Sequence, residues 1–188
     1  MSHMGLMKPY LDRYQKIMTA AEYEMDGLKI DGDRFVRSVA AEFMQGGLVY
    51  FAGNGGSAGI CSHMATDFAK NGKIPALALN DSSALTCIGN DIGFDQVFAE
   101  QLKWHGGPAD VLIAISSSGN SRDILEAVYA ARNIGMCVIT LSGFGNDNRL
   151  RKLGDYNAYL ESDNYGFVET GHAQILHAIL DIKMGWQP

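Results

Sequence analysis

The hydrophobic and polar positions of this chain follow a helical spacing first and a strand–helix alternation later. Over roughly residues 6–27, apolar side chains recur every three or four positions, and Gly27 marks the predicted helix end. A second amphipathic helix is predicted over about 32–45, before Gly46-Gly47. Because no earlier layer covers their apolar faces, we expect these two helices to build an oligomer interface.

From residue 48 onwards, short apolar runs alternate with helical patterns. Strands are predicted over 48–52, 74–79, 111–115, 136–141 and 156–160. Helices are predicted over 58–69, over a short stretch capped by Asp81-Ser82-Ser83, and over 91–104, 122–133, 146–153 and 167–183. This alternation predicts an α/β fold: a three-layer α-β-α sandwich around a parallel sheet of about five strands. In such sheets, ligands bind at the carboxyl ends of the strands, where the strand order reverses.

No repeat, low-complexity tract or linker divides the 188 residues, so the sequence predicts a single domain over 1–188. Residues 6–46 would hold the N-terminal helices and 47–185 the α/β core. Residues 1–5, beginning Met1-Ser2-His3-Met4, are expected to be a cloning remnant, which removes His3 from any site.

Composition narrows the function classes. The formal net charge is −6 and no Lys/Arg cluster is dense, which argues against a nucleic-acid surface. No apolar run is long enough for a membrane span, and no signal-peptide pattern opens the chain. The three cysteines, Cys61, Cys87 and Cys137, lack metal-type spacing and stand among apolar or small residues. We therefore expect buried thiols and a cytoplasmic protein.

The stretch 116–121, called the serine loop here, lies between a buried strand and a helix. It consists of Ser116, Ser117, Ser118, Gly119, Asn120 and Ser121. Hydroxyls and backbone N–H groups at a helix N-terminus are suited to hold a phosphate. The alternative is that Ser121 caps the helix while the other serines fill a turn. One cap needs one serine, so four favour the phosphate site.

The stretch 53–57, called the glycine turn here, follows another strand and opens another helix, as a phosphate-binding turn does. It reads Gly53-Asn54-Gly55-Gly56-Ser57, with Ala58 where the dinucleotide fingerprint prefers its third glycine. No acidic residue ends the following strand and no Gly-Lys-Ser/Thr is present, so no nucleotide cofactor is expected. The alternative is a tight turn with Ser57 as helix cap.

Four helical positions carry candidate proton-transfer or metal chemistry. His63 and Asp67 are four apart and share one helix face, either as an exposed pair or as metal ligands or a base with its partner. Glu169 and His177 point within about a quarter turn of each other on the last helix, whereas His172 faces away. Together His63, Asp67, Glu169 and His177 could form a four-ligand zinc set. Alone, Asn90-Asp91 between Gly89 and Gly93 is typical of a turn.

Four motifs in order resemble the sugar isomerase (SIS) domain family, and more closely its bacterial sedoheptulose 7-phosphate isomerase (phosphoheptose isomerase) branch. They are the glycine turn, Ile88-Gly89-Asn90-Asp91-x-Gly93-Phe94, the serine loop after Ile115, and Gly135-Met136-x-Val138-Ile139-x-Leu141-x-Gly143. The match spans about residues 47–183.

The resemblance implies a SIS, flavodoxin-like fold and a homotetramer with active sites between subunits. It also implies conversion of an open ketose 7-phosphate to an aldose 7-phosphate, with Zn²⁺ in some members. The expected substrate contacts are Asn54, Gly55, Gly56, Ser57, Asn90, Asp91, Ser116, Ser117, Ser118, Asn120, Ser121 and Glu169. The expected catalytic residues are Asp67 and His177, and the expected metal ligands His63, Asp67, Glu169 and His177.

Three positions depart from the family pattern. Asp67 stands where the family has Glu, Glu169 where it has Gln, and Gly166 where it has Asp. A shorter carboxylate alters proton-transfer reach, and an added carboxylate favours a divalent metal. The expected function is isomerisation of sedoheptulose 7-phosphate to D-glycero-D-manno-heptose 7-phosphate through an enediol. The alternatives are an isomerase of another phosphorylated sugar and a non-catalytic sugar-phosphate-binding or scaffold protein.

Overall fold

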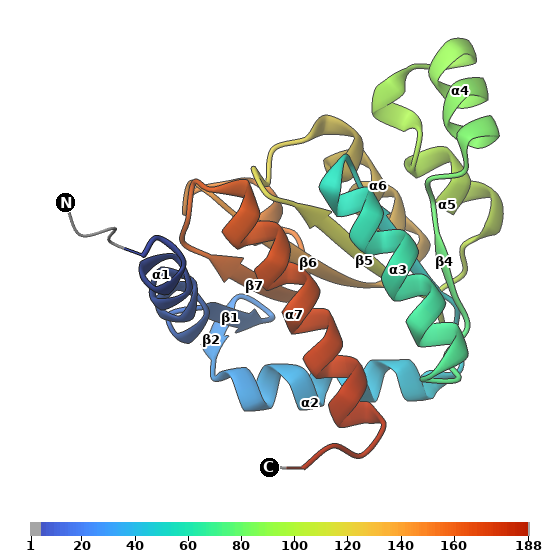
Figure 1. The fold of residues 1–188 in the computed structure, drawn as a ribbon. Coiled ribbons are helices and arrows are strands. Elements are labelled where there is room, and N and C mark those ends of the chain that lie inside the picture. Colours follow the sequence, from blue (N-terminus) through green and yellow to red (C-terminus); the bar gives the residue numbers. More distant parts are fainter. Residues whose placement is uncertain (1–4, 188) are drawn as a thin grey trace.

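The computed structural model describes residues 5–187, so residues 1–4 of the expected remnant 1–5, and the last residue, lie outside it. Figure 1 shows the elements. The helices are α1 (Met7–Thr19), α2 (Gly32–Glu42), α3 (Gly56–Lys70), α4 (Ser82–Asp91), α5 (Ala99–His105), α6 (Arg122–Ile134) and α7 (Tyr165–Lys183), with 3-10 turns η1 (Phe43–Gln45), η2 (Phe94–Gln96) and η3 (Leu150–Lys152). The strands are β1 (Glu22–Met25), β2 (Leu28–Ile30), β3 (Val49–Gly53), β4 (Ala76–Ala78), β5 (Val111–Ser116), β6 (Cys137–Gly143) and β7 (Tyr156–Leu160).

One seven-stranded sheet runs through the molecule in the order β2-β1-β7-β6-β5-β3-β4. Strands β4, β3, β5, β6 and β7 pair in parallel, which confirms the predicted five-stranded parallel sheet. The chain leaves β3 towards β4 on one side and later builds β5, β6 and β7 on the other. The strand order therefore reverses between β3 and β5.

Each central strand is buried on both faces, which explains its continuous apolar run. Along β3, Val49 and Phe51 pack towards α2, α3 and α7, whereas Tyr50 and Ala52 pack towards α4, α5 and α6. Helices α3 and α7 lie side by side on the first face and run in the same direction (Figure 1). These two apolar layers confirm the three-layer α-β-α sandwich.

The helix predicted over residues 6–27 is wrong beyond Thr19. The chain instead forms the hairpin β1–β2, and β1 pairs antiparallel with β7. Asp26 (φ 52°) and Gly27 (φ 74°) form the turn, and two positive φ values are the backbone of a type I′ hairpin. The apolar residues at 21 and 25 fit a helical spacing, but Tyr23 and Met25 pack against the core from a strand.

The helix predicted over 91–104 is also wrong, because Gly93 (φ 141°) breaks it into the end of α4, the turn η2 and the short helix α5. The helix predicted over 146–153 reduces to η3. The expectation of buried thiols fails at Cys87, which is exposed on α4, whereas Cys61 is buried.

The two N-terminal helices differ in burial. Helix α2 packs against α7 and buries Phe35, Val36 and Val39. Helix α1 buries only Ile17 among its residues and leaves Met7 and Leu11 exposed. Within residues 5–187, none of the helices combines the length and apolar content of a membrane span.

Candidate active site

A cavity of about 290 Å³ opens at the carboxyl ends of β3 and β5, where the strand order reverses. The serine loop follows β5 and the glycine turn follows β3, so both reach this edge because the strands are parallel neighbours. The cavity is lined by Asn54, Gly55, Gly56, Ser57, Ile115, Ser116, Ser117, Ser118, Ser121, Tyr165 and Glu169.

The serine hydroxyls in this cavity are not consumed by helix capping. Ser121 occupies the N-cap position of α6, yet its side chain makes no capping hydrogen bond. Its Oγ instead accepts from Ser116 Oγ at 3.2 Å. Ser117 Oγ is buried and has no hydrogen-bond partner among residues 5–187. A buried hydroxyl without a partner is costly, so Ser117 marks a position that a bound polar group would satisfy.

Three helices begin at this cavity: α3 after Gly55, α6 after Ser121, and α7 at Tyr165. Their free N–H groups and the positive ends of their dipoles create an anion-binding environment. No Lys or Arg is among the described cavity-lining residues. Positive potential at this cavity therefore comes from backbone N–H groups, which are suited to an anionic ligand.

The glycine turn brings a second helix close to the cavity. Gly55 (φ 53°) is the N-cap of α3, so Ser57 lies inside the helix and is not its cap. A Cβ added to Gly56 would overlap the carboxylate of Glu169 on α7. The absence of a side chain at Gly56 thus lets the Glu169 carboxylate rest against the start of α3.

Asp123, in the first turn of α6, is a site residue that sequence reasoning missed. The residue is 5% exposed, and its Oδ2 accepts from Asn54 Nδ2 at 2.7 Å. Burial raises the pKa of the Asp123 carboxyl, and the hydrogen bond from Asn54 opposes that shift. In the sequence, an Asp in the first turn of a helix is explained by the helix dipole alone, so only the fold reveals its partner.

Tyr165 was also missed. It lines the cavity while 60% exposed, and its ring lies edge-on to Phe144 with 4.8 Å between ring centroids. Phe144 has a left-handed backbone (φ 55°), and its carbonyl accepts from Tyr159 Oη at 2.7 Å. In the sequence, nothing about an aromatic residue at the start of a helix indicates that it lines a cavity.

Three expected substrate contacts lie outside the cavity lining. Asn90 and Asp91 are exposed at the end of α4, where Asn90 Nδ2 donates to Asp91 Oδ1 at 2.7 Å. Asn120 is turned towards the following loop, where its Oδ1 accepts from the backbone N–H of Arg149 at 3.2 Å. Within one chain, these residues are not brought to the cavity.

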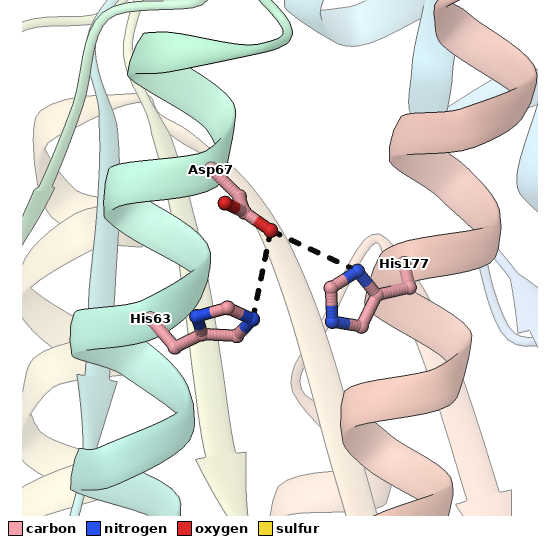
Figure 2. A group of neighbouring side chains, drawn as sticks. All are labelled: His63, Asp67 and His177. Carbon is pink, nitrogen blue, oxygen red and sulfur yellow. Dashed lines mark ion pairs between the residues drawn. The ribbon is translucent and has the colours of Figure 1, made fainter.

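Figure 2 shows His63 and Asp67 on α3 facing His177 on α7. Asp67 Oδ2 lies 3.5 Å from His63 Nε2 and 4.0 Å from His177 Nδ1, and the two imidazole centroids are 5.2 Å apart. The side chain of Asp67 is 22% exposed and that of His63 is 58% exposed. We call these three residues the His–Asp–His group; it is open to solvent on one side.

The His–Asp–His group fits a metal ion. One potential ligand atom from each residue lies within 4.8 Å of the others. Zinc bound at about 2.0–2.2 Å in a tetrahedron holds its ligand atoms about 3.5 Å apart, so small side-chain movements suffice. Glu169 is not part of this group. It lies about two turns before His177 on α7, and its carboxylate lies against Gly56 of α3.

His172, on the same helix, has the opposite environment. It is fully buried, and its Nε2 lies 3.1 Å from the carbonyl oxygen of Ser142. Burial lowers its pKa to about 4, so it stays neutral near pH 7. His172 is therefore a core residue, as its position on the far side from His177 indicates.

Comparisons with known proteins agree with this architecture. The family model described as "SIS domain" matches residues 9–143. The chain is 42% identical over 153 residues to the phosphoheptose isomerase of Solidesulfovibrio magneticus, covering 78% of this chain and 74% of that protein. It is 34% identical over 185 residues to phosphoheptose isomerase 1 of Campylobacter jejuni, covering 95% and 97%.

Solved structures give the same result. A phosphoheptose isomerase from Francisella tularensis superposes with a TM-score of 0.82 at 27% identity, covering 99% of this chain and all of that one. Phosphoheptose isomerase GmhA from Neisseria gonorrhoeae superposes with a TM-score of 0.73 at 29% identity, covering 95% and 99%. The chain therefore belongs to the SIS domain family and, within it, to the phosphoheptose isomerases.

Proposed function

We propose that this protein isomerises sedoheptulose 7-phosphate to D-glycero-D-manno-heptose 7-phosphate. The observation that carries the proposal is that the cavity and the His–Asp–His group lie along the same two helices. A cavity of hydroxyls and helix N-termini lies at the start of α3 and α7, and the His–Asp–His group lies further along the same two helices. The identity of the substrate is inferred from the relatives named phosphoheptose isomerase.

The separation between these two parts supports a long substrate. His63 follows Gly56 by seven positions on α3, which corresponds to about 10 Å along the helix axis. About seven bonds separate the carbonyl carbon of an open heptulose from its phosphorus. At roughly 1.2 Å per bond, as in an extended backbone, they span about 8 Å. Adding hydrogen-bond reach of about 3 Å covers the distance, whereas a triose phosphate falls short.

The proton transfers are assigned to Asp67 and His177. The Asp67 carboxylate would remove the proton from the carbon beside the carbonyl, and the His177 imidazole would exchange protons with the oxygen, giving an enediol. His63, 3.5 Å from Asp67 Oδ2, would orient that carboxylate. In the cavity, Ser116, Ser117, Ser118 and Ser121 would hold the phosphate, and Asn54, Ser57 and Glu169 would contact the sugar chain.

We also propose that one Zn²⁺ per site is held by His63, Asp67 and His177. When bound, zinc polarises carbonyl and hydroxyl oxygens. Glu169 can serve as a fourth ligand only if its carboxylate leaves the position over Gly56. The donor set of two imidazoles and a carboxylate supports this metal.

We further propose a cytoplasmic homotetramer with active sites between subunits. Met7 and Leu11 expose apolar surface on α1, and Asn90 and Asp91 are exposed at the end of α4. In such an assembly, Asp91 would contact the hydroxyls of a substrate bound by another copy. Analytical ultracentrifugation tests the tetramer, and a monomer at micromolar concentration would contradict it.

The function is tested on the unmodified protein with a panel of six- and seven-carbon sugar phosphates and an elemental analysis. Turnover of sedoheptulose 7-phosphate above the other sugars, with about one zinc per chain, is the expected result. Preference for a six-carbon phosphate would reassign the substrate. Phosphate-ester binding without turnover or metal would instead identify a binding or scaffold protein.

A further inference from the structure

The buried carboxylate of Asp123 is not used by the reaction assigned above. It lies behind the cavity on α6, whereas Asn54, its hydrogen-bond partner, lines the cavity from the glycine turn. The two residues are 69 positions apart in the sequence, and their contact joins the loops that follow β3 and β5. The carboxylate of a residue that is 5% exposed is costly to bury, so a role in the site is worth seeking.

The chemistry of this contact fixes the orientation of the Asn54 amide. An ionised carboxylate can only accept hydrogen bonds, and an amide has a donor side and an acceptor side. Facing Asp123, Asn54 must present Nδ2, as the 2.7 Å contact shows. The flipped amide would bring Oδ1 against the carboxylate oxygen, which places two acceptors together.

The orientation decides what Asn54 offers to a ligand. Among residues 5–187, no other side-chain hydrogen bond engages Asn54, so Oδ1 is left as an acceptor at the cavity. The oxygens of a phosphate dianion only accept, whereas a sugar hydroxyl can donate to Oδ1. The serine hydroxyls and helix N–H groups supply the donors that a phosphate needs. The cavity thereby contains a donor region for phosphate and an acceptor for a hydroxyl.

We propose that Asp123 is a positioning residue for sugar recognition, which holds Asn54 so that its Oδ1 accepts a hydrogen bond from a substrate hydroxyl. This inference rests on the proposed function only for the identity of the sugar. It predicts that Asp123 affects binding of the sugar part of the ligand and leaves binding of the phosphate part unchanged.

The test compares two ligands, sedoheptulose 7-phosphate and inorganic phosphate, by titration calorimetry on the full-length protein. The variants are Asp123→Ala, which removes the acceptor, Asp123→Asn, which keeps an oxygen acceptor without the charge, Asn54→Ala, and Asp123→Ala combined with Asn54→Ala. We expect Asp123→Ala to weaken sugar-phosphate binding about tenfold and inorganic phosphate binding less than twofold. Asp123→Asn should stay within about threefold for both ligands.

The double variant separates positioning from a general structural effect. If Asp123 acts through Asn54, Asp123→Ala causes no further loss once Asn54 is Ala. Additive losses, or equal weakening of both ligands by Asp123→Ala, would overturn the inference. Should Asp123→Ala not fold, Asp123→Ser replaces it, because serine is accepted near helix N-termini and is too short to reach Asn54.

The same experiment distinguishes a wrong substrate from a wrong role of Asp123. If sedoheptulose 7-phosphate does not bind the unmodified protein, the proposed substrate is wrong. The same four variants are then compared with the tightest-binding member of the sugar-phosphate panel. If Asp123→Ala weakens binding of that sugar phosphate but not of inorganic phosphate, the role of Asp123 is still supported. If it weakens neither ligand, or both equally, the role is still refuted.

Discussion

Apart from Glu169, Tyr165 and Ile115, the cavity is lined by small uncharged residues of two loops, whereas the His–Asp–His group consists of three titratable side chains on partly exposed helix faces. The cavity is defined by where β3 and β5 end and where three helices begin, so its position follows from the fold itself. The His–Asp–His group depends on side-chain identity at three positions. The comparison indicates that substitutions should affect chemistry sharply in the second region and affinity gradually in the first.

The largest effect is expected for Asp67→Asn. The amide keeps the size of the side chain but cannot accept a proton, so turnover should fall about 10³-fold, within the range for loss of a general base. Inorganic phosphate should still bind within about twofold of the unmodified protein. Steady-state kinetics measure the turnover, and titration calorimetry measures the phosphate binding. Asp33→Asn, at an exposed position on α2, is the matched control. Full activity of Asp67→Asn would remove this residue from the mechanism.

The second-largest effect is expected for removal of the metal. Dialysis against a chelator should lower turnover about 100-fold, with recovery on adding zinc, because the metal polarises the reacting oxygens. Phosphate binding at the serine loop should not change, since no residue of the His–Asp–His group lines the cavity. A parallel loss of phosphate binding would show that the two regions are not independent.

His172 tests whether a histidine on the buried face of α7 acts only on stability. Its pKa falls from an ordinary 6.5 to about 4 because burial disfavours the charged form. The unfolded chain therefore binds a proton between these values and the folded chain does not. The stabilisation is complete above pH 6.5, decreases as the pH falls, and is lost below about pH 4.

At pH 5, this loss amounts to about 2 kcal/mol relative to pH 7. Urea unfolding at both pH values should show that His172→Gln reduces the pH dependence by that amount. His105→Gln, at an exposed position at the end of α5, should leave it unchanged. An unaltered pH dependence in His172→Gln would mean that another group titrates.

The smallest effect is expected for a single serine. Ser121→Ala removes one hydroxyl from a cavity that retains other hydroxyls and the helix N–H groups, so sugar-phosphate affinity should fall about tenfold. The turnover number should change less than twofold, and α6 should keep its stability because Ser121 makes no capping bond. Ser38→Ala on α2 is the control. A large loss of stability would restore the capping explanation.

The parallel sheet and the position of its ligand edge were predictable from the sequence, because apolar runs such as 111–115 have the length and β-branched content of buried strands and alternate with helical patterns. The hairpin β1–β2 was not predicted, although Asp26-Gly27 is a strong I′ turn signal. The apolar spacing up to Met25 also fits a helix, and pairing with β7, more than a hundred residues later, decides the outcome.

For the site, residue type and helical spacing made His63, Asp67 and His177 candidates, but only the fold brings α3 and α7 together and places the three side chains side by side. Residue type and spacing did not place Glu169. Helical side chains tilt towards the N-terminus, which brings its carboxylate to Gly56, and the room for it exists only because residue 56 lacks a side chain. Asp123 was hidden for a related reason: its partner Asn54 comes from another strand–helix connection.

The hairpin has a further consequence at the rims of the sheet. With β1 and β2 added beside β7, the outermost strands of the described chain are β2 and β4, each three residues long. Lys29 on β2 is exposed and pairs with Glu22 at 3.1 Å. Both edges are short, and Lys29 adds a charge to β2, so they offer little template for strand addition by another molecule, which guards a protein with an apolar core against aggregation.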